Sequence, residues 1–211
     1  MKRDLYIVGA GGFGREVFAW LMELPGAGQE WVFKGFLDDN LAALDGFTYP
    51  IGVVSSVTGF KPGPNDSFVC GIGSVGAKRH ACAPLIGAGA HFLTVVHPTA
   101  VMGPNVILGD GVVLCPRVTL TCDIEVGAMA MINCHSTVGH DAKVGAWSTM
   151  SAHCDLTGHT SLGEGAFLGS GARVIPNKSV GSGAMVGAGS VVIKSVPEGV
   201  KVFGNPAREI G

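Results

Sequence analysis

The chain has 211 residues, 47% of them apolar, and its 14 basic and 16 acidic side chains give a formal net charge of −2. This length is enough for two small domains, each with a core of its own. The near balance of charge leaves no basic surface for DNA or RNA, so we expect no nucleic-acid partner. The six cysteines show no CxxC spacing, which favours buried free thiols.

No segment has the pattern of a membrane span or a secretion signal. Residues 81–109 contain no Lys, Arg, Asp or Glu, but proline, histidine and asparagine interrupt them. The apolar run after Lys2 and Arg3 is short and meets Arg15 and Glu16 without a cleavage site. We therefore expect a cytoplasmic protein with no membrane partner.

The first 96 residues have the pattern of a small α/β domain with a half-Rossmann-like parallel sheet. The predicted elements, in chain order, are a buried strand, a glycine-rich turn, a helix, two further strands and a second helix, at residues 5–8, 9–14, 15–24, 32–37, 67–72 and 75–85. This parallel unit is long enough for only one mononucleotide-binding half, whereas NAD would need two.

The turn from Gly9 to Gly14 has the spacing GxGxxG between a strand and a helix. Such a turn can hold a phosphate, because glycines admit a ligand to the backbone and the helix N-terminus offers unpaired N–H groups. The alternative is that the glycines only allow the strand and the helix to pack closely. Asp38 and Asp39 follow the next strand, where a carboxylate can accept hydrogen bonds from a ribose or a base.

The second part of the chain carries an internal repeat. Sixteen positions spaced six residues apart, from Met102 to Val192, are all aliphatic or methionine, and glycine follows nine of them. Three hexapeptides make one turn, which predicts a triangular parallel β-helix of about five coils. We place this β-helix at residues 97–196 and a C-terminal tail at 197–211.

His140 and Asp141 are the strongest candidates for acid–base chemistry. An imidazole titrates near neutral pH, and a nearby carboxylate can fix its tautomer and support its charge. Adjacent strand residues point to opposite sides, so only a corner would let both side chains converge. Gly158 stands one coil above His140, where its N–H can face a developing oxyanion. The alternative is an ordinary solvated histidine at the β-helix edge.

Three other histidines raise the question of zinc. Zinc needs three or four convergent ligands. The stacking of residues eighteen apart places His135 under His153, whereas His140 and His159 belong to two other columns. We therefore expect no metal, and we expect His135, His153 and His159 to form polar surface.

Six segments of the chain resemble the hexapeptide-repeat sugar acetyltransferases, in particular the nucleotide-sugar N-acetyltransferases of the bacillosamine pathway and the sialic acid O-acetyltransferases. The segments are IVGAGGFGREV, GFLDD, VVHPTAVMGP, INCHSTVGHD, LTGHTSLGEGAFLGSGARVIP and VFGNPAR. The resemblance covers nearly the whole chain, and the glycine-rich domain in front of the repeat is its most selective part.

The resemblance implies a left-handed β-helix and a homotrimer that binds acetyl-CoA between neighbouring β-helices. It makes His140 the catalytic base beside an acidic residue, which is usually Glu in the family and is Asp141 here. Some relatives carry a second histidine nine residues later, where this chain has Thr149. Asn133 matches a position beside the acceptor, and Gly158 matches one whose amide faces the thioester carbonyl.

The resemblance also suggests two sets of ligand-binding residues. We expect the nucleotide-sugar substrate to bind at Gly9, Gly11, Gly12, Phe13, Gly14, Asp38, Asp39, Gly71 and Asn133. We expect acetyl-CoA to bind at Gly158, Thr149, Ala188 and Asn205.

The expected function is acetyl-CoA-dependent acetylation of the amino group of a nucleotide-linked amino sugar, by direct transfer with His140 as general base. The alternatives are a sugar O-acetyltransferase of the sialic acid type, a β-helix zinc enzyme, or a trimer that binds a sugar nucleotide without catalysis.

Several large apolar side chains fall outside the inward column of the repeat. They are Met129, Trp147, Phe167 and Met185. These side chains must find cover elsewhere or lie exposed, and exposed apolar groups in this number indicate a subunit interface. In the trimer that the resemblance implies, closed cyclic symmetry would repeat this interface three times.

Overall fold

A computed structural model describes residues 2–210, which fall into two compact units with the boundary between Val95 and Val96. Among these residues, no helix has the length and apolar character needed to cross a membrane. All six cysteines are free; four are buried, and Cys122 and Cys134 are half-buried.

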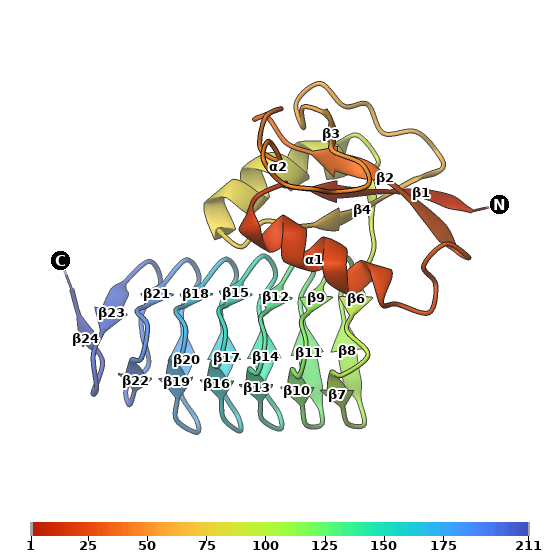
Figure 1. Ribbon diagram of the computed structural model, residues 1–211. Helices are drawn as coiled ribbons and strands as arrows, with labels where there is room; N and C mark the ends of the chain where they lie inside the picture. The colour runs from red at the N-terminus through yellow and green to blue at the C-terminus, as the bar shows by residue number, and fades with distance from the viewer. Residues whose placement is uncertain (1, 211) are drawn as a thin grey trace. The chain divides into compact units, whose positions relative to one another are not determined.

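The first unit is a five-stranded parallel sheet in the order β3-β2-β1-β4-β5, with two helices (Figure 1). Its elements are β1 (Arg3–Val8), α1 (Gly12–Met22), β2 (Trp31–Leu37), β3 (Val53–Ser55), β4 (Asp66–Cys70), α2 (Val75–Gly87) and β5 (His91–Phe92). The predicted half-Rossmann-like sheet is confirmed. Helix α1 begins three residues earlier than predicted, because the Arg15 N–H already donates a helical hydrogen bond to the Gly11 carbonyl (3.1 Å).

Helix α1 connects β1 to β2 and helix α2 connects β4 to β5, so these two connections run in opposite directions across the sheet. Right-handed crossovers then place the two helices on opposite faces of the sheet. The carboxyl ends of β1 and β4 form the switch point of the sheet, which is where open α/β sheets bind their ligands. Backbone hydrogen bonds of 2.8 Å from Gly9 to Leu37 and from Gly71 to Val8 hold the ends of β1, β2 and β4 together.

The second unit is a parallel β-helix built from three sheets (Figure 1). One sheet contains β7 (Val101–Met102), β10 (Thr119–Leu120), β13 (Thr137–Val138), β16 (Asp155–Leu156), β19 (Arg173–Val174) and β22 (Val191–Val192). The next contains β8 (Val106–Leu108), β11 (Ile124–Val126), β14 (Lys143–Val144), β17 (Ser161–Leu162) and β20 (Ser179–Val180). The third contains β6 (Val95–Val96), β9 (Val113–Leu114), β12 (Met131–Ile132), β15 (Thr149–Met150), β18 (Phe167–Leu168), β21 (Met185–Val186), β23 (Lys201–Phe203) and β24 (Arg208–Glu209).

The strand register confirms that residues eighteen apart stack on one another. Thr119 pairs with Thr137, for example, and Thr137 with Asp155. Fourteen of the sixteen repeat positions are buried, which confirms the inward column. The exceptions, Met102 and Leu108, lie in the first coil, where no preceding coil covers them.

The corners between the sheets use the left-handed backbone region. One column of corners consists of Asn105, Asp123, Asp141, His159 and Asn177, with φ between 53° and 60°. Asn and Asp tolerate this region better than most residues, because their short polar side chains can bond locally. Every coil therefore turns at the same height and presents the side chain of this column on one edge.

The segment expected to form a C-terminal tail, residues 197–211, contains two strands. Strand β23 pairs in parallel with β21, and β24 turns back against β23 in the antiparallel direction. Its strands therefore extend one sheet of the β-helix.

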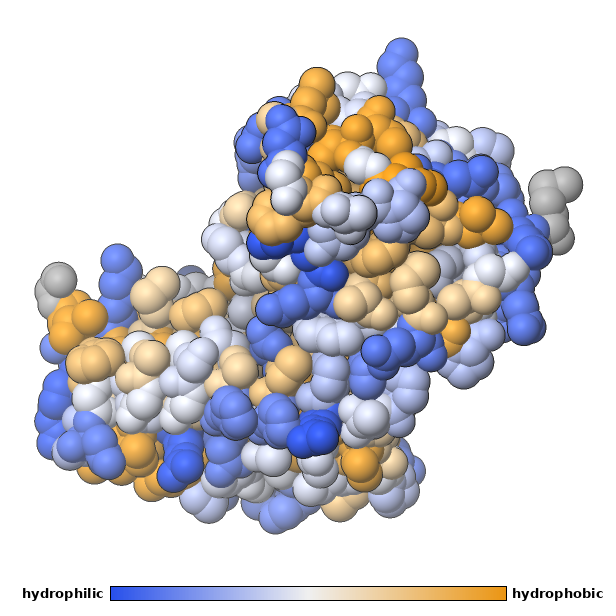
Figure 2. All heavy atoms as spheres, viewed as in Figure 1, coloured by the Kyte–Doolittle hydropathy of each residue, from blue (hydrophilic) through white to orange (hydrophobic). Residues whose placement is uncertain are grey.

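The four apolar side chains outside the inward column do not behave alike. Met129 is buried (3% exposed), so it finds cover within the chain. Trp147 and Phe167 are half-buried, and Met185 is 43% exposed. Figure 2 shows apolar side chains on the surface of both units. Val101, Ile107, Met185 and Phe203 are exposed apolar residues of the β-helix.

We predict that Ile132→Ala lowers the free energy of unfolding by about 2–5 kcal/mol, because it empties a fully buried position of the inward column. Met102→Ala is the matched control in the same column, since Met102 is 44% exposed. Urea denaturation at fixed protein concentration measures both variants. Equal losses would show that burial in this column does not set stability.

Candidate active site

His140 and Asp141 converge because Asp141 occupies a corner, with φ of 58°. The corner turns the two neighbouring side chains toward each other, and His140 Nδ1 lies 2.7 Å from Asp141 Oδ2. The coils above and below fix this backbone: the Asp141 N–H donates to the Cys122 carbonyl (3.3 Å), and the His159 N–H donates to the His140 carbonyl (2.9 Å).

The charge distribution suits a general base. The hydrogen bond from His140, and then the nearby charges of His159 and His140, lower the pKa of Asp141, so this carboxylate is ionised near neutral pH. A carboxylate accepts and does not donate, so His140 carries its proton on Nδ1 and leaves Nε2 as an acceptor. Both side chains are about half exposed, which leaves Nε2 open to a substrate.

Gly158 lies directly against the imidazole of His140. A Cβ at position 158 would lie 2.5 Å from His140 Nε2, so any other residue there would displace the ring. Within residues 2–210, the Gly158 N–H makes no hydrogen bond, while its carbonyl accepts one from Asn177. A backbone N–H without a partner is a donor that can stabilise an oxyanion intermediate.

His159 stacks on Asp141 in the same corner column, and its side chain also reaches the Asp141 carboxylate, where we expected only polar surface. Its Nε2 lies 3.6 Å from Asp141 Oδ2, and its ring meets that of His140 edge-on at 5.1 Å. The signal in the sequence is the spacing of eighteen between Asp141 and His159, which stacks them at one corner. His135 and His153 stack as predicted, with ring centroids 4.9 Å apart.

The other predicted residues of the β-helix are distributed along it. The Asn133 side-chain oxygen accepts a hydrogen bond from the Cys134 N–H (2.6 Å). Ala188 and Asn205 are exposed, whereas Thr149 is only 1% exposed and offers a ligand little side-chain surface.

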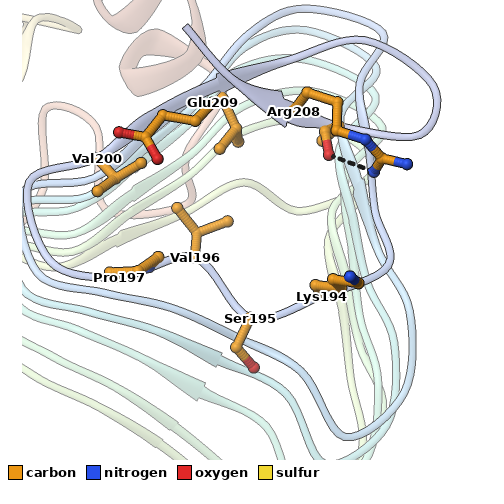
Figure 3. A pocket seen from close by; sticks show the side chains of 9 residues that line it. Lys194, Ser195, Val196, Pro197, Val200, Arg208 and Glu209 are labelled. Atoms are coloured by element: carbon orange, nitrogen blue, oxygen red, sulfur yellow. Dashed lines mark hydrogen bonds between the residues drawn. The ribbon is translucent and has the colours of Figure 1, made fainter. Parts of the chain in front are cut away.

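A separate cavity of about 320 Å³ lies at the C-terminal end of the β-helix (Figure 3). Lys194 and Arg208 lie on one side of it, and Val196 and Pro197 contribute apolar surface. Arg208 donates to the carbonyl of Ala207 (3.1 Å). The lining of this cavity includes neither His140 nor its neighbours Asp141, Gly158 and His159.

The glycine turn of the first unit is compatible with both of the roles that the sequence left open. Gly9, Gly14 and Gly71 are buried and pack on one another: a Cβ on Gly14 would overlap the Gly9 carbonyl oxygen, and one on Gly71 would lie 2.7 Å from the Gly14 Cα. Gly11 and Gly12 are exposed, and a Cβ on Gly11 would meet no atom within 4 Å. Packing therefore explains three glycines, and the other two leave the backbone open to a ligand.

The two aspartates after β2 differ in their partners. Asp38 braces the turn, since its carboxylate accepts the N–H groups of Ala10 (2.8 Å) and Asn40 (2.9 Å). Asp39 accepts the Thr58 N–H and hydroxyl, both at 3.2 Å. Asp39 also borders a cavity of about 230 Å³, which is lined as well by Phe60 and His80.

Phe13 and Arg15 flank the start of α1. Phe13 is half-buried against Trp20, with ring centroids 5.9 Å apart. The Arg15 guanidinium carbon lies 3.9 Å from the centre of the Phe47 ring, and one of its terminal nitrogens lies 3.8 Å from the position of a Cβ on Gly12. Arg15 was missed as a site residue, because a single arginine at a helix start has no distinctive spacing.

Arg15 brings a positive charge close to the turn. Its Nε is buried and has no hydrogen-bond partner among residues 2–210, and the first turn of α1 contains no acidic residue. The Arg15 cation lies at the positive end of the helix dipole, which is unfavourable. An anion bound at the N-terminus would offset both the guanidinium charge and the partial positive charge of the helix end. The turn is therefore suited to an anion such as a diphosphate.

Comparisons with known proteins cover the whole chain. Residues 4–83 match the family model of the PglD N-terminal domain. WeeI from Acinetobacter baumannii AYE is 31% identical with a TM-score of 0.86, over 99% of this chain and 100% of its own. No curated protein matches the chain in sequence.

Two other similar structures contain ligands. The acetyltransferase domain of PglB from Neisseria gonorrhoeae FA1090, in complex with acetyl-coenzyme A, is 27% identical over 100% of both chains with a TM-score of 0.85. PerB from Caulobacter crescentus, in complex with CoA and GDP-perosamine, is 30% identical over 99% of this chain and 97% of its own, also with a TM-score of 0.85.

We predict losses of stability of different size for two glycines of the turn. Gly14→Ala should lower the free energy of unfolding by at least about 1–3 kcal/mol, because the methyl group overlaps the Gly9 carbonyl. Gly11→Ala should cost less than about 1 kcal/mol, the difference between glycine and alanine at a helix N-cap. Thermal denaturation measures the stability of both variants. A Gly14→Ala protein as stable as the parent would contradict the packing role of Gly14.

Proposed function

This chain belongs to the hexapeptide-repeat sugar acetyltransferases, and we propose that it transfers the acetyl group of acetyl-CoA to the amino group of a nucleotide-linked amino sugar. The observation that carries the proposal is the arrangement at His140: Nδ1 bonded to Asp141, and Nε2 open beside Gly158. Two relatives support acetyl-CoA as the donor: the PglB domain binds acetyl-CoA, and PerB binds CoA with GDP-perosamine.

The proposed reaction is a direct transfer. The neutral amine of the sugar attacks the thioester carbonyl and passes its proton to His140 Nε2, while the Asp141 carboxylate stabilises the imidazolium that forms. The Gly158 N–H donates to the oxyanion of the tetrahedral intermediate. The intermediate then collapses with loss of the CoA thiolate, which takes up the proton from His140.

An amine is the proposed acceptor because PerB is a perosamine N-acetyltransferase and its structure holds an amino sugar on a nucleotide. At the β-helix, Asn133 is the proposed contact to this acceptor, and Gly158, Ala188 and Asn205 are proposed contacts to CoA. Thr149 remains a proposal that rests on the resemblance alone, since its side chain is buried.

The first unit is proposed to hold the nucleotide. Gly11 and Gly12 expose their backbone at the start of α1, where the diphosphate would meet the helix N-terminus and Arg15. Asp38 and Asp39 would accept hydrogen bonds from the ribose and the base, and the cavity beside Asp39 offers space for the base. This division gives each substrate its own unit, and holding two reactants in register supplies much of the rate of a direct transfer.

The proposed assembly is a homotrimer in the cytoplasm, with CoA bound between neighbouring β-helices. Large apolar side chains on the surface of the β-helix support a subunit interface. They include Val101, which is 60% exposed, Ile107 (65%) and Phe203 (54%).

We predict that His140→Ala lowers kcat by about 10²- to 10⁴-fold, the range expected for losing a general base. Binding of CoA and the melting temperature should change little, because the side chain is exposed. Asp141→Asn should be milder, since it keeps the corner conformation and removes only the charge. Steady-state kinetics measure both variants, and a His140→Ala enzyme with half of the parental kcat would exclude His140 as the base.

We predict that Arg15→Gln raises the KM for the nucleotide sugar by about tenfold or more, since charge-assisted hydrogen bonds contribute about 1.5–3 kcal/mol. The KM for acetyl-CoA should stay nearly constant. Arg3→Gln is the matched control, because Arg3 lies at the other end of β1 from the glycine turn. Equal changes in both KM values would argue against separate donor and acceptor units.

We predict that the protein is a trimer at micromolar concentration, which multi-angle light scattering measures. Association of identical chains in a closed ring would remove the exposed apolar side chains of the β-helix from water. A monomer that transfers acetyl groups at the full rate would contradict both the trimer and a donor site shared between chains.

A further inference from the structure

His140, Asp141 and His159 form a cluster of potential metal ligands within the part of the chain that the structure describes. One ligand atom from each lies within 4.8 Å of the other two. His140 Nδ1 is 2.7 Å and His159 Nε2 is 3.6 Å from the same oxygen, Asp141 Oδ2. All three side chains are about half exposed, so an ion from solution can reach them.

The ligand set is one that zinc prefers. Zinc binds imidazole nitrogen and carboxylate oxygen at about 2.0–2.2 Å in a tetrahedron, which separates neighbouring ligand atoms by about 3.3 Å. The two distances to Asp141 Oδ2, 2.7 Å and 3.6 Å, lie on either side of this value. Small side-chain rotations would therefore bring these ligand atoms to tetrahedral spacing. The fourth position would hold water.

The backbone holds the ligands in place before any ion binds. Asp141 and His159 occupy equivalent corners of successive coils, with φ of 58° and 53°. A hydrogen bond from the His159 N–H to the His140 carbonyl ties the third ligand to the same level. The ion would therefore meet a preorganised site, and its net charge would be offset by the ionised carboxylate.

We infer that His140, Asp141 and His159 form a zinc site, and that zinc bound there inhibits acyl transfer. The inhibition rests on the proposed function, in which His140 Nε2 accepts the proton of the acceptor. When a metal occupies Nδ1, the single proton of the neutral ring resides on Nε2. Nε2 then has no lone pair for the acceptor, and Asp141 no longer supports the imidazolium.

The chain offers a matched pair of variants for the test. His159→Asn removes one ligand, and His153→Asn removes an exposed histidine from another corner column. Both residues have left-handed φ values (53° and 60°), a conformation that asparagine accepts and that Asn105 and Asn177 already adopt in the column of His159. Both variants keep all six cysteines, so thiol binding contributes equally to each.

Isothermal titration of the full-length protein with zinc chloride, without CoA or added thiols, measures binding independently of activity. We expect one site per chain that depends on His159. His159→Asn should weaken zinc binding at least about tenfold, the lower bound for perturbing even an outer-shell partner, and His153→Asn should bind like the parent. Absence of this site in the parent, or equal affinity in the parent and His159→Asn, would overturn the metal site.

Initial transfer rates, taken before CoA thiol accumulates, test the inhibition. Zinc should inhibit the parent and His153→Asn, EDTA should restore both, and His159→Asn should require at least about tenfold more zinc for the same inhibition. Full activity of the zinc-loaded parent would overturn the inhibitory role. If no acetyl transfer occurs under any condition, the proposed function fails, while the titration still decides the metal site.

Discussion

The stacking of residues eighteen apart, with a left-handed corner at a fixed height in every coil, is the constraint on which the site depends. It turns neighbours in sequence, His140 and Asp141, toward each other and places residues from the next coil, Gly158 and His159, against them. The inward aliphatic column stabilises this register, because a slip would expose buried side chains. The geometry of the candidate site in the β-helix is therefore a consequence of repeat geometry.

The fold was predictable because its main signal is periodic. One aliphatic position in every six residues specifies a parallel β-helix, and the register and burial of that column confirm it. The strand, turn and helix of the first unit were also found, but the start of α1 was placed three residues too late. The cause is that Gly12 and Gly14, poor helix formers, lie inside the first turn, where packing on Gly9 outweighs propensity.

The site was predictable only in part. His140, Asp141 and Gly158 follow from spacing, and so does the stacking of His159 on Asp141. The convergence of both histidines on one Asp141 oxygen requires the direction of side chains at a corner, which a column map does not contain. Arg15 reaches the glycine turn through a ring contact with Phe47, thirty-two positions away in the chain, and no local pattern records it. The glycines likewise divide into packing and open positions only when their neighbours are known.

The central claim is that the two units join an acetyl donor and a nucleotide-linked amine in one direct transfer. A transfer assay with acetyl-CoA and matched pairs of UDP-, GDP- and dTDP-linked sugars, each pair differing only in an amino or a hydroxyl group, tests it most directly. We expect one amino sugar to be acetylated on nitrogen with one CoA released for each product formed. Acetylation of only the hydroxyl partners, or release of CoA without an acetylated sugar, would contradict it.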